Sequence, residues 1–357
     1  MVGAFFIQSP PAPTGSEPMR LSPRSAAAAL RRRLRDAAPR SKEFLHVIAT
    51  RHGIGVFDEQ WFAYRQLMME HLTLASLDAQ EDRDFVWVVA VDRDMPPRAR
   101  KRLDGLAESR PYLRIAETEL KRDFVPDLAA WTAAEAKARK KGWVLTTRLD
   151  DDDAIHRGLV GRLREEAAAY LAGGGRASVI LSPVLGVNWV PAKAAGHRAY
   201  HHSPSIGLSL LERAEDPRTV YRNNHRTLAQ ALVPWDYNVR HLDGETPWWL
   251  YAHTGLSHMQ SEGSDRMDKV AGHRRAFKLD AARLAPFGVT AAGARIIRET
   301  PEPEVTESLF ELNRRGLDLE DEIHGLREAA RGGDEAARER IAELHAERRR
   351  IHERLVR

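Results

Sequence analysis

Short apolar runs alternate with amphipathic stretches along most of the chain. Five strands are predicted, over residues 45–50, 85–91, 113–116, 143–149 and 179–185. Helices are predicted after Asp58, over 126–142, and from about 154 to 171. The run 85–91 is apolar on both faces, as expected of a central parallel strand. This alternation predicts an α/β fold with a mostly parallel sheet and flanking helices.

The two ends of the chain differ from this middle part. Residues 1–43 are rich in Pro, Ala, Ser and Arg, which predicts a flexible basic arm. The main domain follows over 44–300. Residues 301–357 carry two charged amphipathic stretches separated by Gly332-Gly333, which predicts a helical hairpin. Such a hairpin needs a further apolar surface, either its own domain or a second copy of the chain, and we favour a homodimer.

Composition and charge narrow the function classes. The chain has no cysteine, which excludes disulfides, thiolate catalysis and iron–sulfur ligation. The net charge is +4, but the arm alone contributes +5, so the remainder is close to neutral and indicates no nucleic-acid partner. The arm is either a solvated extension or a peripheral contact with anionic lipid headgroups. No apolar run could span a bilayer or form a signal peptide, so we expect a cytoplasmic protein.

Four consecutive aspartates, Asp150 to Asp153, follow the predicted fourth strand. Ligands bind at the carboxyl ends of strands in open α/β sheets, and adjacent carboxylates repel unless a cation joins them. Mg²⁺ typically joins one or two carboxylates to substrate phosphates. Asp150 and Asp152 are therefore the predicted ligands of Mg²⁺ or Mn²⁺, with Asp153 sharing or orienting the metal. The alternative is a loop in which Asp153 caps the next helix.

Further polar residues follow the first two strands and should share this edge. Asp92 could accept hydrogen bonds from a base or ribose, and Arg51, next to Thr50, could hold a diphosphate. The chain has no G-x-G-x-x-G motif and no phosphate loop ending in Gly-Lys-Ser. Dehydrogenase and nucleoside-triphosphatase functions are therefore disfavoured.

Several of these segments together resemble a known family. Residues 74–80 and 84–92, with the acidic run 149–153, are similar to the opening and the D-x-D motif of family 2 glycosyltransferases. More narrowly, 50–55, 61–65 and 147–153 resemble a family of bacterial rhamnosyltransferases. The resemblance covers about residues 44–260. It implies a GT-A fold with a nucleotide-sugar half, 44–155, and an acceptor half, 156–300.

The resemblance also implies an activity. The expected reaction is metal-dependent transfer of a sugar, with rhamnose as a candidate, from a nucleotide-diphosphate donor to a glycan or other hydroxyl acceptor. Thr50, Arg51, Asp92, Arg148 and Asp151 would contact the donor. His253 resembles a late histidine of the family and is a candidate metal or diphosphate ligand, although a lone histidine is often structural.

The catalytic base has no clean match to the family pattern. Asp236 and Asp243 are the candidates by position, with Glu212 and Glu245 also in range. Half of the tryptophans and four of the seven tyrosines fall within 189–251, where they either bind the acceptor or pack in the core. Two alternatives stay open. One is a non-catalytic nucleotide-sugar or glycan-binding protein, and the other is a nucleotidyltransferase using Gly53-Ile54-Gly55 at its phosphates.

Overall fold

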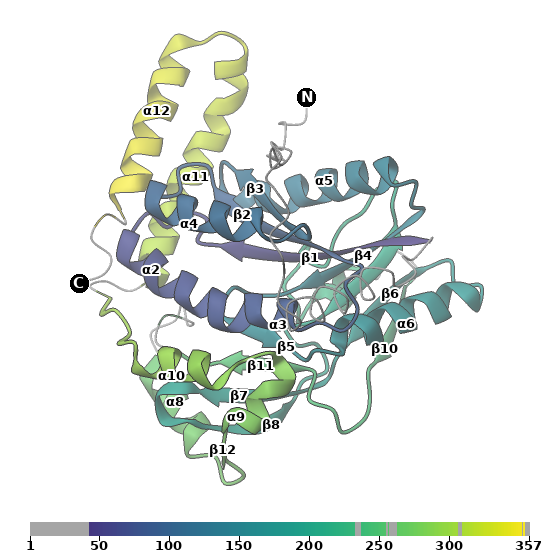
Figure 1. The fold of residues 1–357 in the computed structure, drawn as a ribbon. Coiled ribbons are helices and arrows are strands. Elements are labelled where there is room, and N and C mark those ends of the chain that lie inside the picture. The colour runs from purple at the N-terminus through teal and green to yellow at the C-terminus, as the bar shows by residue number, and fades with distance from the viewer. Residues whose placement is uncertain are drawn as a thin grey trace, which may run out of the picture.

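The computed structural model describes residues 43–232, 237–254, 256, 263–305, 309–351 and 353. A seven-stranded sheet forms the centre of the molecule, in the order β10-β6-β9-β4-β1-β2-β3 (Figure 1). All of its strands are parallel except β9, which runs antiparallel to both neighbours. The strands are β1 Phe44–His52, β2 Val86–Asp92, β3 Leu113–Thr118, β4 Trp143–Arg148, β6 Ser178–Ser182, β9 Ser209–Arg213 and β10 Tyr237–His241. The predicted α/β fold class is confirmed.

Alternate residues of the central strands enter two separate cores. In β2, Trp87, Val89 and Val91 face one core, while Val86, Val88 and Ala90 face the other. All seven residues of β2 are buried, which is why its sequence is apolar without alternation. Helices α2 Glu59–Met68, α4 Pro97–Glu108 and α6 Leu159–Ala172 cover the first face, and α5 Phe124–Ala138 covers the second.

Helix α2 begins where the sequence predicts. Asp58 is its N-cap, and its carboxylate accepts a hydrogen bond of 2.7 Å from the backbone N–H of Trp61. The helix continues into a π-helical segment, Met69–Leu74, and then into α3, Ala75–Asp78. Widened turns of this kind often lie at functional sites, and this one directs Thr73 toward the acidic run.

A second sheet was not predicted. Its order is β12-β8-β7-β11-β5, with β5 Asp153–Ile155, β7 Leu185–Val190, β8 Ala195–Tyr200, β11 Trp249–Ala252 and β12 Phe277–Lys278. The helix expected from about residue 154 begins only at Leu159, because residues 153–155 pair with 249–251 of β11 instead. The predicted strand 179–185 is likewise two strands, β6 and β7. The short helices α8 Gly263–Ala271, α9 Ala281–Leu284 and α10 Ala291–Glu299 accompany this sheet (Figure 1).

The predicted C-terminal hairpin is present as α11 Leu309–Arg331 and α12 Glu335–Arg350, with the break at Gly332-Gly333. It packs on its own chain, where Ile323 and Leu344 enclose Leu120. Leu312, near the start of α11, joins the first core. Leu312, Ile323 and Leu344 of the apolar stripe are thus buried within one chain, and the homodimer stays a prediction. In the described part of the chain, every helix is too short or too polar to cross a membrane.

Candidate functional site at the carboxyl edge of the main sheet

The acidic run is the connection between the two sheets. Strand β4 ends at Arg148 and β5 begins at Asp153, so the intervening residues turn at the carboxyl edge of the main sheet. The hydroxyl of Thr73 lies 2.8 Å from the carbonyl oxygen of Asp153 and 3.3 Å from that of Asp150. The turn is therefore fixed at both ends by the π-helical segment. The predicted location of the four aspartates is correct, but Asp153 begins a strand and does not cap a helix.

Two of the aspartates are bound by basic side chains of the protein itself. The Arg65 guanidinium donates to Asp151 and, at 2.5 Å, to Asp152. The ring of His52, at the end of β1, lies 2.5 Å from the other oxygen of Asp151. Burial opposes ionisation of Asp151, but Arg65 and His52 outweigh it and lower its pKa to about 2. Arg65 is 7% exposed, so this is an interior ion pair.

Asp153 differs from the other three aspartates. It is fully buried, and its carboxylate accepts a 3.1 Å hydrogen bond from the backbone N–H of Ala252 in β11. Burial, and then the charges of Asp152 and Asp150, raise its pKa well above the usual range. His253 directly follows Ala252 and is also buried, with its ring 4.3 Å from that of Tyr251. His253 is thus the neighbour of a residue that binds Asp153, and its role as a metal or diphosphate ligand stays a prediction.

Asp150 is the aspartate that faces outward, with 30% of its side chain exposed. Its carboxylate lies 4.0 Å from Nε of Arg148. The guanidinium groups of Arg148 and Arg51 both stack on the ring of Tyr221, at 4.8 and 5.5 Å. The Tyr221 hydroxyl in turn donates to the carbonyl oxygen of Ala49 at 2.9 Å. Two arginines therefore contact the same ring, and one of them, Arg148, lies next to an accessible carboxylate.

Thr50 lies within β1 and has a structural role. It is fully buried, and its hydroxyl accepts a hydrogen bond of 2.9 Å from the indole N–H of Trp87.

Lys121, which the sequence did not single out, lies close enough to Arg51 to interact with its charge. Burial, and then the positive charges of Arg51 and Arg348, lower the pKa of Lys121 to about 8. It adds a third cationic group to this edge.

The loop after β1 approaches Asp92 closely. Gly53 has φ of +64°, and a Cβ there would clash with the ring of Phe62, so glycine is required. Gly55, at φ +83°, donates its N–H to Asp92 at 3.0 Å. Asp92 is the last residue of β2, as predicted, but it is fully buried beneath Arg348 of α12.

The residues fit a divalent cation only in part. In the part of the chain that the structure describes, no three His, Asp or Glu side chains form a cluster that could hold a metal. Asp151 and Asp152 already bind Arg65, which leaves Asp150 as the accessible carboxylate. One carboxylate together with substrate phosphates is a ligand set that Mg²⁺ uses in proteins. The predicted set of Asp150, Asp152, Asp153 and His253 does not converge on one point.

The candidates for acceptor binding and catalysis lie farther away. Asp236 and Trp235 fall outside the described residues. Asp243 is exposed beyond β10, three strands from β4 and thus about 14 Å along the sheet. Glu212 lies in β9 opposite Val144, toward the other edge of the sheet. Trp189, Tyr221 and Trp249 are at most 6% exposed, so core packing accounts for them.

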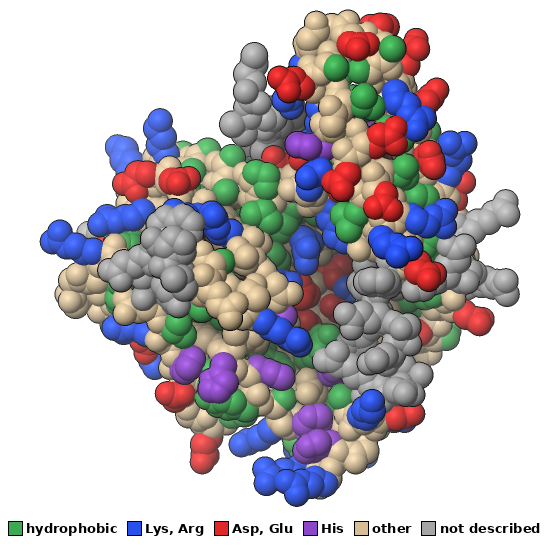
Figure 2. Space-filling model, turned by 180° about the vertical axis from the view of Figure 1, so that it is seen from behind, with side chains coloured by type: hydrophobic (Ala, Val, Ile, Leu, Met, Phe, Trp, Pro, Cys, Tyr) green, Lys and Arg blue, Asp and Glu red, His purple; other side chains and the backbone are tan. Residues whose placement is uncertain are grey.

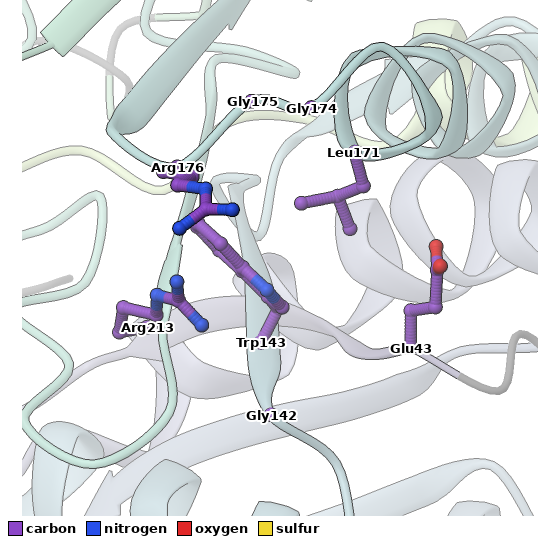
Figure 3. A pocket seen from close by; sticks show the side chains of 8 residues that line it. All are labelled: Glu43, Gly142, Trp143, Leu171, Gly174, Gly175, Arg176 and Arg213. Carbon is purple, nitrogen blue, oxygen red and sulfur yellow. The ribbon is translucent and has the colours of Figure 1, made fainter.

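One face of the molecule has a depression in its surface (Figure 2). Figure 2 shows a depression with acidic side chains deep inside it and Lys and Arg side chains around it. A separate open pocket of about 470 Å³ lies at the opposite edge of the main sheet, lined by Glu43, Trp143, Arg176 and Arg213 among others (Figure 3). There Arg213 stacks on Trp143 at 4.2 Å, but no acidic turn accompanies it.

Fold and geometry together define an α/β protein whose candidate site lies at the carboxyl edge of the sheet, on an acidic turn flanked by arginines. Residues 36–239 match the model of the family described as "Putative rhamnosyl transferase". This match covers more than half of the chain, and the chain belongs to that family. The resemblance inferred from the sequence is confirmed.

Solved structures with a similar fold include two of S. aureus TarS, residues 1–349. One has 12% identity and a TM-score of 0.32, with 71% of this chain and 69% of that chain covered. The other, in complex with UDP, has 12% identity, a TM-score of 0.33, and 72% and 69% coverage. CMP:2-keto-3-deoxy-manno-octonic acid synthetase complexed with CTP has 11% identity, a TM-score of 0.31, and 58% and 92% coverage. No curated protein matches the chain. At these scores the family assignment rests on the sequence match.

Proposed function

We propose that this protein transfers a sugar from a nucleotide-diphosphate donor to a hydroxyl acceptor, with rhamnose as the candidate sugar. The observation that carries the proposal is that Arg51 and Arg148 both stack on Tyr221 at the carboxyl edge of the sheet, with Asp150 4.0 Å from Arg148. Arg51 and Arg148 offer several N–H donors in a fixed orientation, which suits the oxygens of a diphosphate. Lys121 adds charge on the same side.

The other residues of the edge have distinct proposed roles. Asp92 would accept a hydrogen bond from the nucleoside once it is uncovered. Asp150 would hold Mg²⁺ or Mn²⁺ together with the donor phosphates, and such a cation neutralises the charge that builds on the leaving diphosphate. Arg65 and His52 orient the turn that presents Asp150. Asp236 and Asp243 stay the candidates for the base that deprotonates the acceptor.

The nucleotidyltransferase alternative is less favoured. It would need backbone N–H groups of the loop after β1 at the phosphates. The N–H of Gly55 instead donates to Asp92. A non-catalytic binding protein would share the donor site, and only an assay of sugar transfer separates it from the proposed enzyme.

Calorimetry with UDP, dTDP and GDP, with and without Mn²⁺, tests the donor site. Arg148→Ala should weaken binding of the preferred diphosphate at least about tenfold, since it removes a charge-assisted contact. Arg213→Ala is the matched control, because it removes an arginine stacked on an aromatic ring at the opposite edge. Asp150→Asn should abolish the gain in affinity that Mn²⁺ provides. Equal affinity in Arg148→Ala and Arg213→Ala would reject the assignment.

A further inference from the structure

The C-terminal hairpin reaches into the carboxyl edge of the main sheet. Arg348, in the last turn of α12, donates from one guanidinium nitrogen to Asp92 and from the other to the carbonyl oxygen of Glu119 at 3.1 Å. Glu320 of α11 lies 3.2 Å from the same guanidinium. Arg348 is 1% exposed, although its helix is otherwise highly charged. A side chain from the far end of the chain is thus buried at the end of β2.

The hydrogen-bonding capacity of Asp92 is largely used in this arrangement. One carboxylate oxygen accepts from Gly55 and Arg348, and the other accepts from the backbone N–H of Asp94 at 2.9 Å. A carboxylate offers about four acceptor positions, so at most one remains. The fully buried Asp92 has no surface for a ligand to reach. A nucleoside can contact Asp92 only if Arg348 moves away.

The guanidinium of Arg348 has features of a nucleobase. It is planar, it presents N–H donors to a carboxylate, and it lies 5.2 Å from the centre of the Phe57 ring. Uracil, thymine and guanine are also planar, with ring N–H donors that a carboxylate can accept. Phe57 belongs to the loop after β1, next to the glycines that shape this end of the site.

We propose that Arg348 occupies the nucleoside subsite of its own chain, so that the C-terminal hairpin competes with the donor for Asp92. This inference rests on the proposed function, because it assigns Asp92 to the donor nucleoside. Donor binding then requires the end of α12 to release Asp92, and release and binding are linked equilibria. The donor's apparent affinity is then its intrinsic affinity multiplied by the fraction of molecules in which the subsite is open.

The contacts between the hairpin and the main domain are of a kind that allows the hairpin to move away from the domain. Among the described residues, the apolar cluster beneath the hairpin has three buried members, Leu120, Ile323 and Leu344, with Leu319, Leu326 and Ile341 packed against it. Ile351, directly after α12, also packs against the main core, and ion pairs add to these contacts, such as Arg327 with Asp123 at 2.6 Å and Arg349 with Asp94 at 2.6 Å. Polar contacts of small area are typical of elements that move relative to a domain. Leu312 in the main core would keep the base of the hairpin attached.

Calorimetry on the full chain tests the competition. Arg348→Ala should bind the preferred nucleoside diphosphate about tenfold more tightly than the wild type, because the occupant of the subsite is gone. Arg349→Ala is the matched control. It removes the neighbouring ion pair with Asp94 on the same helical turn, yet leaves Asp92 covered, so its affinity should stay within about twofold of the wild type. Arg348→Ala binding no tighter than Arg349→Ala would overturn the proposal.

Two further measurements keep the test decisive. Asp92→Asn in the Arg348→Ala background should remove the gain in affinity, because the gain depends on the exposed carboxylate. If the gain persists in the double variant, Arg348 does not act through Asp92 and the proposal is wrong. Thermal unfolding of each variant shows that it is folded, and Arg348→Lys supplies a folded variant that keeps the charge but loses the planar group. If no variant binds any nucleoside diphosphate while the wild type also fails, the proposed function itself is rejected.

Discussion

Two buried arginines cover carboxylates at the same edge of the main sheet, and they reach it from different parts of the chain. Arg65 belongs to α2, next to β1, inside the region that matches the family. Arg348 belongs to α12, beyond the family match. Each is at most 7% exposed, and each pairs with an aspartate that the sequence placed in the donor site.

The difference lies in what surrounds each pair. Arg65 is enclosed by the main core and by His52, so its aspartates are held in one arrangement. Arg348 is carried by a hairpin that has its own apolar cluster and joins the main core at Leu312 and Ile351. The same chemical contact is therefore a fixed part of the site in one region and, in our proposal, a removable cover in the other. Breaking an interior pair is costly in both cases, but only the hairpin can move away as a unit.

Removing Arg65 should have the largest effect. Arg65→Met leaves Asp151 and Asp152 as adjacent buried charges, and we expect a loss of about 3–5 kcal/mol in the free energy of unfolding. Urea denaturation at pH 7 measures it. Arg102→Met, which breaks the exposed pair with Glu70, should cost at most about 1 kcal/mol. Similar losses in both variants would show that Arg65 is not an interior anchor.

Lowering the pH should reduce the stability of the Arg65 site and of the hairpin contacts. Burial raises the pKa of Asp151, but Arg65 and His52 outweigh burial and lower this pKa to about 2. The pKa of Glu119 is also lowered to about 2, chiefly because its carboxylate is hydrogen-bonded to His345 of the hairpin. A lowered folded-state pKa gives stability that is present above the unfolded value and is lost as the pH falls. The loss should therefore occur between about pH 4 and pH 2, by about 2 kcal/mol for Asp151.

Urea denaturation as a function of pH measures this dependence. Asp151→Asn should have a flatter acid limb of the stability curve than the wild type, and Glu119→Gln should also flatten the pH dependence of amide exchange in α12. An unchanged acid limb in Asp151→Asn would contradict the assigned pKa.

Added salt should weaken the ion pairs of the hairpin but not the ion pair of Arg65. Raising NaCl from 0.05 to 0.5 M shortens the screening length from about 14 to about 4 Å. The partly exposed pairs of the hairpin should weaken, and amide exchange in α12 should rise about three- to tenfold. Exchange in α2 should not change, because the Arg65 pair is interior. Equal acceleration in both helices would remove the distinction between a fixed and a removable cover.

Deleting residues 1–42 should have the smallest effect. The described contacts of Arg65 and Arg348 lie entirely within the rest of the chain. Nucleoside diphosphate affinity should stay within about twofold, while sedimentation with anionic vesicles falls because the basic arm is gone. A loss of nucleotide binding in the folded shortened chain would show that the arm belongs to the site.

The sequence by itself predicted β1, β2, β3, β4 and β6 of the main sheet, its mostly parallel arrangement, and the edge at which the candidate site lies. Parallel strands share a carboxyl edge, so residues that follow them meet there whatever the details of packing. Asp92, Arg51 and Asp150 were placed correctly for this reason. The cap at Asp58 and the break at Gly332-Gly333 are local signals, and both are confirmed.

Only the tertiary structure decided which groups pair at that edge. Arg65 and Asp152 are 87 positions apart, and Arg348 and Asp92 are 256 apart, so no local pattern connects them. Residues 153–155 form a strand because β11, almost a hundred positions later, offers an edge to pair with. Strand pairing and buried ion pairs depend on which distant groups the fold brings within a few ångströms. Periodicity and capping report only on neighbours within a few turns.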